Sequence, residues 1–176
     1  MGVEDLSAIR NQSSRPGRVD RTWPSDWADR RRGTGCPFCA EGRPEENEDG
    51  ARIFSGRCTD AYLSRWDAQP GYTVVVWRGR HVAEPTELTE EEATCYWREL
   101  LTVSRALEER FQPAKTNYQI LGNAVPHLHT HVMLRYEGDP APGRPLPWPA
   151  GGRPAVPVER FQAECAALRV LLARPR

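Results

Sequence analysis

The sequence predicts an α+β domain in which an antiparallel sheet of about five strands carries one main helix. Three observations support this prediction. Residues 127–134 alternate strictly between histidine or methionine and apolar or β-branched side chains, as in a strand. Residues 89–111 have helical periodicity behind a capping sequence, and short β-branched runs are separated by glycine and proline turns. An N-terminal extension and a C-terminal helix flank this unit.

The strands are predicted from runs bounded by turn residues. Residues 52–55 and 60–64 form two paired strands around Gly56, and the turn Gln69-Pro70-Gly71 precedes a strand over residues 72–77. Residues 117–121 and 127–136 are the last two strands. The core is therefore expected to be a small α+β unit, in which these strands form an antiparallel sheet with one principal helix.

The main helix begins with a capping box, Thr89 at the N-cap and Glu92 three residues later. Apolar and small side chains then recur with helical spacing up to Phe111, two residues before Pro113. We expect its aromatic side chains to pack in the core.

We divide the chain into residues 1–35 as an N-terminal extension, 36–139 as the domain, and 140–176 as a proline-rich segment followed by a C-terminal helix. Trp23 and Trp27 lie four residues apart and offer a docking pair for the domain or for a second subunit. Prolines at positions 140, 142, 145, 147 and 149 predict extended chain. An amphipathic pattern from Val158 to Ala173 predicts the final helix.

The charge is balanced, with 24 basic and 24 acidic residues, so nothing indicates a nucleic-acid or membrane partner. The first residues lack the apolar core of a signal peptide. The longest apolar runs are far shorter than a membrane span. We therefore expect a cytoplasmic protein, in which disulfides are not expected.

Three of the four histidines, His127, His129 and His131, stand at alternate positions of one predicted strand. Alternation puts them on one face, with neighbours roughly 6–7 Å apart. Imidazole acts as base, acid, nucleophile or metal ligand. A solvated polar face and a pure metal face are the alternatives to a reaction site, which we favour.

A metal site is predicted from Cys36, Cys39, His81 and one histidine of the strand, most naturally His127 at its entry. Two cysteines and two histidines suit tetrahedral zinc, which would be structural. A redox pair and two simply packed cysteines are the alternatives. We take the other three cysteines, at positions 58, 95 and 165, to be small hydrophobic residues.

These residues resemble the histidine triad (HIT) superfamily. The run His127-Leu128-His129-Thr130-His131-Val132 matches its His-φ-His-φ-His-φ-φ signature, where φ is an apolar residue. The resemblance extends to Cys36-Pro37-Phe38-Cys39, to Pro70-Gly71-Tyr72 with the strand that follows, to Arg80-His81-Val82, and to the start of the main helix. It covers about residues 36–136.

The resemblance implies a HIT-like fold and an enzyme, commonly a homodimer, that cleaves or transfers at the α-phosphate of a nucleotide. Its substrates would be dinucleoside polyphosphates, nucleoside phosphoramidates or nucleotide sugars. By the same resemblance His129 is the nucleophile, and His131 contacts the phosphate or the leaving group. His127 orients the site, and its other nitrogen binds zinc.

Substrate contacts are expected from Asn123, Asn117, Ser64 and Trp66. Ser64 stands where many relatives carry an acidic residue for the ribose, and Ala124 lacks their hydroxyl. Residues 122–126 resemble a bacterial diadenosine polyphosphate hydrolase-like subgroup. Two rival functions are an enzyme of specialised metabolism that acts on a nucleotide intermediate and a non-catalytic nucleotide-binding protein.

Overall fold

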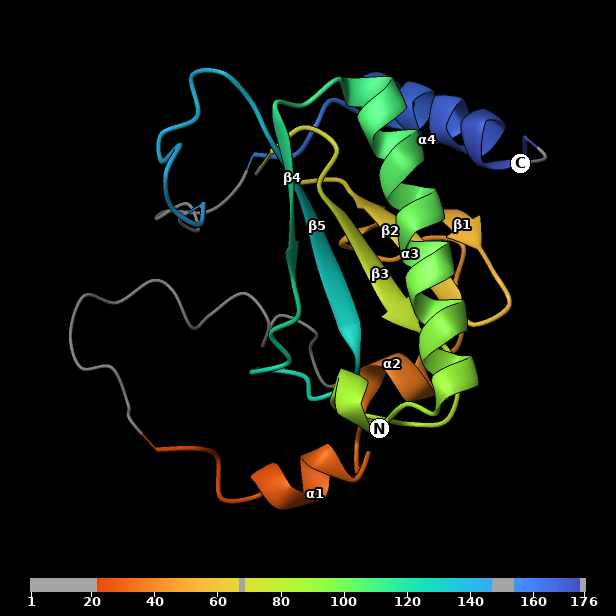
Figure 1. Cartoon of the computed structure of the whole chain (residues 1–176), viewed down its shortest axis with the longest axis vertical. Coiled ribbons are helices and arrows are strands. Elements are labelled where there is room, and N and C mark those ends of the chain that lie inside the picture. The colour runs from red at the N-terminus through yellow and green to blue at the C-terminus, as the bar shows by residue number, and fades with distance from the viewer. Residues whose placement is uncertain (1–21, 67–68, 147–153, 175–176) are drawn as a thin grey trace.

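The computed structural model describes residues 22–66, 69–146 and 154–174. Its centre is one antiparallel sheet with the strand order β1-β2-β3-β5-β4 (Figure 1). The strands are β1 (Gly50–Ser55), β2 (Thr59–Ser64), β3 (Thr73–Trp77), β4 (Lys115–Gln119) and β5 (His129–Arg135). The predicted α+β architecture of five strands and one main helix is confirmed.

The main helix, α3 (Glu90–Phe111), begins at the predicted capping box. Thr89 accepts a hydrogen bond from the Glu92 backbone N–H, and the Glu92 carboxylate accepts one from the backbone N–H of Thr89. The C-terminal helix is α4 (Val158–Leu172). Three shorter helices are α1 (Trp27–Arg31), α2 (Pro37–Ala40) and the 3-10 helix η2 (Pro85–Glu87), none of them predicted.

The two faces of the sheet have different roles. One face packs against α3 and α4 and forms the core, which includes the following buried side chains from strands and helices: Ala51, Ile53, Ala61, Leu63, Val75, Val132, Leu134, Tyr96, Leu100, Val103, Leu107, Phe161 and Leu168. Alternation therefore points the intervening residues of β5, His129 and His131, to the opposite face. Tyr96 of α3 is hydrogen-bonded to Thr130 of β5, with 2.6 Å between the hydroxyl oxygens.

The strand that carries the histidines begins two residues later than predicted. Residue 127 was expected inside it, but β5 starts at His129. The backbone N–H of His127 bonds the carbonyl of Val125 in a tight turn, at 2.8 Å. Leu128 donates to Val82 and accepts from Trp77. His127 therefore lies outside β5, in the turn that leads into the strand.

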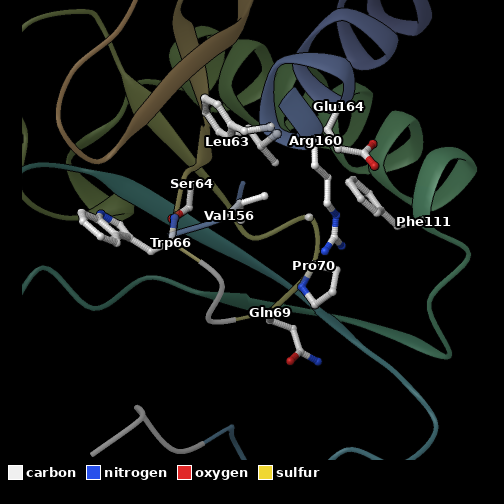
Figure 2. Close-up of a pocket in the computed structure, with 11 residues that line it drawn as sticks. Leu63, Ser64, Trp66, Gln69, Pro70, Phe111, Val156, Arg160 and Glu164 are labelled. Carbon is white, nitrogen blue, oxygen red and sulfur yellow. The ribbon is translucent and has the colours of Figure 1, made fainter. Parts of the chain in front are cut away.

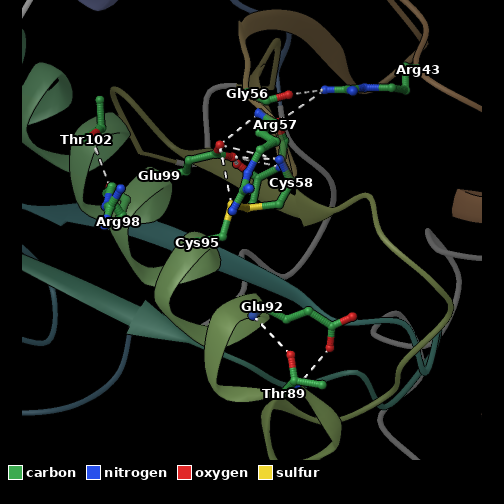
Figure 3. The surroundings of a disulfide bond; sticks show 11 residues. Arg43, Gly56, Arg57, Cys58, Thr89, Glu92, Cys95, Arg98, Glu99 and Thr102 are labelled. Carbon is green, nitrogen blue, oxygen red and sulfur yellow. Dashed lines mark hydrogen bonds between the residues drawn. A yellow bond between two sulfur atoms is a disulfide. The ribbon is translucent and has the colours of Figure 1, made fainter.

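The expectation of no disulfide was wrong, because Cys58 and Cys95 are bonded in the structure. The bond links the chain just before β2 to the second turn of α3 (Figure 3). Glu99, one turn further along α3, accepts hydrogen bonds from the backbone N–H groups of Arg57, Cys58 and Thr59. Helix and strand are thus joined by a covalent bond and a carboxylate that caps the start of β2.

The predicted tails are described only in part. The Trp23 and Trp27 rings lie 4.5 Å apart, and Trp23 is 61% exposed. The expected prolines at positions 147 and 149 lie outside the described residues. α4 packs on β1 and α3 and adds its apolar residues to the common core. Among the described helices, none combines the length and apolar character needed to cross a bilayer.

Candidate functional site

Two histidines lie side by side on the open face of the sheet. The backbones of His129 and His131 pair with Val76 and Val74 of β3, which fixes their spacing along β5. Their ring centroids are 4.8 Å apart and the planes are nearly perpendicular. His129 is 7% exposed, whereas His131 is half-buried. Two reactive side chains of one strand therefore face the same space.

The ring of His129 uses one of its two nitrogens in a hydrogen bond to the backbone. Its Nδ1 lies 2.6 Å from the backbone carbonyl of His127. A carbonyl oxygen only accepts, so Nδ1 carries the hydrogen and Nε2 carries the lone pair of the neutral ring. Burial lowers the pKa of His129, which favours this neutral form. Neutral imidazole with an Nε2 lone pair is the form that attacks phosphorus.

His131 is held by a tyrosine that the sequence analysis did not select. The hydroxyl of Tyr72 lies 2.6 Å from His131 Nδ1. The two rings are nearly parallel, at 12° and 6.0 Å between centroids. Tyr72 immediately precedes β3, in the Pro70-Gly71-Tyr72 segment, and its side chain is buried. The second nitrogen of His131, Nε2, thus points away from the tyrosine.

The four predicted metal ligands come together, since their donor atoms all lie within 4.8 Å of one another. The His127 Nδ1 atom is 3.3 Å from Cys36 Sγ and 3.5 Å from Cys39 Sγ. His81 Nδ1 is 3.5 Å from Cys39 Sγ. Cys36 is the N-cap of α2 and Cys39 lies within the helix, while the histidines come from the loop after β3 and the turn before β5.

Backbone carbonyls select which nitrogen each of these histidines presents. His127 Nε2 lies 2.8 Å from the carbonyl of Trp77, and His81 Nε2 lies 3.2 Å from that of Arg31. Both rings therefore carry their hydrogen on Nε2 and turn an Nδ1 lone pair toward the thiols. Gly33, with φ +94°, packs its backbone against the His81 ring. Burial lowers the pKa of His127 to about 4, so it stays neutral.

The donor set fits zinc in chemistry and in spacing. Tetrahedral zinc with Zn–S of about 2.3 Å and Zn–N of about 2.0 Å places neighbouring sulfur and nitrogen donors about 3.5 Å apart. The three sulfur–nitrogen distances, 3.3, 3.5 and 3.5 Å, match this value. Two neutral imidazoles and two thiols that become thiolates are a common structural zinc set.

Phe38, between the two cysteines, connects this cluster to the histidine pair. Its ring centroid is 5.4 Å from that of His127 and 5.3 Å from that of His129, both edge-on. Its carbonyl accepts a hydrogen bond from the Arg78 guanidinium, which pairs with buried Asp60. Burial alone would raise the pKa of Asp60, but Arg43 and Arg78 outweigh it and lower the pKa. This ionised network anchors α2 to the sheet.

The two predicted asparagines lie in different surroundings. Asn123 is exposed in the turn that leads to His127. Asn117 lies on β4, and its Oδ1 accepts a hydrogen bond from Arg135 at 2.7 Å. Arg135 also pairs with Asp139 and donates to the carbonyls of Ala141 and Arg144. Asn117 is therefore part of a clasp that holds the start of the proline-rich segment on the sheet.

Ser64 and Trp66 line a small pocket beside α4 (Figure 2). The Ser64 hydroxyl accepts from the backbone N–H of Trp66, and the Trp66 indole donates to Asp49. The other lining residues come from β2, the turn before β3, α3, α4 and the chain before α4, and none is a histidine: Leu63, Gln69, Pro70, Gly71, Phe111, Val156, Arg160, Phe161 and Glu164. Ser64 and Trp66, which were expected to contact the substrate, thus make contacts within the protein near the C-terminal helix.

Tyr72, Phe38 and Arg135 were not selected from the sequence. A signal existed for the first two, because both lie inside segments that carry the family resemblance: Tyr72 directly follows Pro70-Gly71 and Phe38 stands between the two cysteines. Arg135 gave no local signal, because its partners come from β4 and from the chain that follows.

Comparison with known proteins gives one family match and three informative relatives. The family model of the HIT domain matches residues 59–138. A histidine triad protein from Bradyrhizobium japonicum superposes with a TM-score of 0.64 at 30% identity, covering 71% of this chain and 92% of that one. One from Marinobacter aquaeolei VT8 gives 0.59 at 34% identity, covering 70% and 89%. A Saccharomyces cerevisiae bis(5'-adenosyl)-triphosphatase is 27% identical over 90 residues, 48% of this chain and 44% of that protein.

The curated relatives and the solved structures differ in how completely they correspond. The chain spans less than two thirds of the length of the first curated relatives that it matches. By contrast, it covers about nine tenths of the two bacterial structures at 30% identity or more. Together with the domain match, the histidines on β5 and the strand order, this correspondence shows that the chain belongs to the histidine triad family.

Proposed function

We propose that this protein is a nucleotide hydrolase or nucleotidyltransferase that attacks an α-phosphate through His129 and releases a nucleoside monophosphate. The observation that carries the proposal is the hydrogen bond from His129 Nδ1 to the His127 carbonyl. It leaves the Nε2 lone pair of a neutral, buried imidazole as the nucleophile. Dinucleoside polyphosphates and nucleoside phosphoramidates are the proposed substrates, in keeping with the HIT domain match and the yeast triphosphatase relative.

The reaction has two steps. In the first, His129 Nε2 forms a bond to the α-phosphorus while the bond from phosphorus to the leaving oxygen or nitrogen breaks. His131, 4.8 Å away between ring centroids, gives a proton from Nε2 to the departing group. In the second step water attacks phosphorus, the phosphorus–nitrogen bond to His129 breaks, and His131 regains the proton. Nucleoside monophosphate leaves.

We propose that Cys36, Cys39, His81 and His127 hold a structural Zn²⁺. The support is the donor spacing and the two carbonyls that turn Nδ1 of each histidine toward the thiols. Zinc supplies rigidity to α2 and to the turn before β5 rather than a step of the reaction. His127 then acts as a ligand whose carbonyl orients His129, and its own nitrogens do not meet the substrate.

The remaining expectations also stand as proposals. Asn123 is our first candidate for a substrate hydrogen bond, because it is exposed near the histidines in sequence. Asn117, Ser64 and Trp66 are weaker candidates, given their contacts within the protein. All proposed reactive and metal residues fall within 36–139, the domain that we assigned. Exposed apolar side chains on α3 and β4, Trp97, Leu101 and Tyr118, support the proposed homodimer.

The decisive experiment is intact-protein mass spectrometry after brief mixing with diadenosine tetraphosphate or adenosine 5'-phosphoramidate. The reaction is quenched at alkaline pH, because a phosphohistidine bond is labile in acid. An added AMP group that is present in the wild type and absent in His129→Ala supports nucleotidyl transfer through this residue. Circular dichroism of the variant checks that the fold is retained.

A panel of guanosine, cytidine and uridine analogues extends the test beyond adenine. If none of the bases gives an adduct or a released monophosphate, although nucleotides bind, the enzyme proposal is wrong. The protein is then a nucleotide-binding module.

A further inference from the structure

We infer that Tyr72 is the positioning residue for His131, and that its phenol holds the ring so that Nε2 faces the leaving group. The inference rests on the proposed function, because it assigns His131 the proton transfer to that group. Tyr72 itself does not touch the substrate. Its role is to select which nitrogen of His131 is presented.

The contact is short and specific. The phenol oxygen lies 2.6 Å from Nδ1, and the rings stack at 12°. Tyr72 is only 5% exposed, and the hydrogen bond of its hydroxyl to His131 is partly buried. His131 is also 4.8 Å from His129 between ring centroids. One tyrosine therefore constrains the histidine that adjoins the proposed nucleophile.

The tyrosine is itself fixed on both sides by backbone hydrogen bonds. Its N–H donates to the carbonyl of Gln69, and its own carbonyl accepts from the N–H of Ser64 on β2. Gly71 before it has φ +76°, and a Cβ there would lie 2.7 Å from both Leu134 and Phe111. This close turn sets where the phenol points. The geometry is thus built into the turn before β3 rather than left to a free side chain.

A phenol suits this position because its oxygen accepts a hydrogen bond. It accepts from the Nδ1–H of the imidazolium, and it accepts from the same Nδ1–H in the neutral ring that remains after Nε2 has given up its proton. The hydrogen bond therefore persists before and after His131 Nε2 passes its proton to the departing group. No charge is added beside the phosphate, unlike with a carboxylate in the same place.

The first test compares Tyr72→Phe with the wild type on two adenosine 5'-phosphate derivatives. One carries 4-nitrophenol, a leaving group that departs without protonation, and the other carries an alkylamine, which needs a proton. We expect kcat to fall about 10- to 100-fold on the alkylamine substrate, the range for losing a partner that orients a reactive side chain. On the nitrophenyl ester it should fall less than threefold, with little change in KM.

The matched control is Tyr136→Phe. Tyr136 at the end of β5 also uses its hydroxyl in one hydrogen bond, to the carbonyl of Pro70 at 2.9 Å. Removing it perturbs the same turn without touching His131. We expect both substrates to react at wild-type rates in this variant. Equal losses on both substrates for Tyr72→Phe, or equal effects of the two variants, would overturn the inference.

A second readout is independent of turnover. Nitrogen-15 shifts of the His131 ring, followed between pH 5 and 9, report how the hydrogen is shared between Nδ1 and Nε2. We expect Tyr72→Phe to change the balance between the two tautomers, and Tyr136→Phe to leave it unchanged. Unchanged shifts in Tyr72→Phe contradict the inference even if the wild type forms the His129 adduct. If no adduct forms on His129 but the nitrogen-15 shifts of His131 change in Tyr72→Phe, only the proposed function is refuted.

Discussion

The phenyl ring of Phe38 lies edge-on against the imidazole of His129, with 5.3 Å between the ring centroids. Phe38 stands between the two cysteines of α2, and its ring also meets His127. The short helix α2 and its N-cap therefore supply half of the proposed metal ligands and part of the cover over the proposed nucleophile. A change in the metal cluster would reach His129 through this ring as well as through the His127 carbonyl.

Replacing Phe38 with alanine should uncover His129. We expect diethyl pyrocarbonate to modify His129 several-fold faster, measured by peptide mass spectrometry, with a loss of about 1–3 kcal/mol in the free energy of unfolding. Phe54→Ala on β1 is the control, because Phe54 is partly buried and packs against the hydrophobic core of the sheet. An equal acceleration in both variants would mean that loosened packing, rather than lost cover, exposes the histidine.

Replacing Cys39 with alanine should remove the zinc. The wild type is expected to bind one zinc ion per chain by elemental analysis, and Cys39→Ala close to none. We expect its melting temperature to fall by about 10 °C, since a few kcal/mol corresponds to such a shift in a chain of this size. Cys165→Ala serves as the control, because this buried thiol belongs to α4. Full zinc content in Cys39→Ala would refute the assigned ligand set.

The metal-free protein should lose stability in mild acid. Burial lowers the pKa of His127 to about 4 in the folded state, against 6.5 ordinarily. Between these values the unfolded chain takes up a proton that the folded chain does not, so the free energy of unfolding decreases as the pH is lowered. The decline starts near pH 6.5, levels off near pH 4 and amounts to about 3 kcal/mol. Urea titrations at several pH values measure it.

His127→Asn is the matched variant for this prediction, because an amide keeps polar atoms in the turn but does not titrate in this range. Its urea midpoint should depend less on pH between 6.5 and 4 than that of the wild type. An identical pH dependence in both proteins would assign the effect to other groups.

Reduction of the Cys58–Cys95 disulfide should destabilise the fold without moving the site. The 37-residue separation corresponds to about 4 kcal/mol in the chain-entropy model. We expect urea midpoints to drop when dithiothreitol is added, and a Cys58→Ser, Cys95→Ser double variant to be insensitive to it. Thiol counting under denaturing conditions gives three free thiols in the oxidised protein. Five thiols before reduction would show that the bond is not formed.

Local periodicity explains how much of the fold was predictable. The helix over residues 89–111 was placed within one residue because its cap and its apolar spacing are both local signals. The strands were found for the same reason. The start of β5 was wrong because the alternation continues through His127, while the His127 N–H bonds Val125 in a turn and the Leu128 N–H bonds the Val82 carbonyl instead of β3.

The site was predictable where residue type alone implies chemistry. The metal ligands were predicted from the residue types of two cysteines and two histidines. His127 meets the other three from a position outside β5, although it was predicted to lie within that strand. The contact between Tyr72 and His131 joins residues 59 positions apart, and no local pattern indicates it. The disulfide was missed because it depends on how α3 packs against β2.

β5 is an inner strand, hydrogen-bonded to β3 on one side and to β4 on the other (Figure 1). His129 therefore cannot travel toward a bound molecule without breaking two ladders. Adaptation to a new substrate must come from the loops around the sheet, among them the turn at Asn123, the segment clasped by Arg135 and the short helix at Phe38. Loops can change in sequence and length at little cost to the sheet. The reactive atom can stay in one place while the shape around it diversifies.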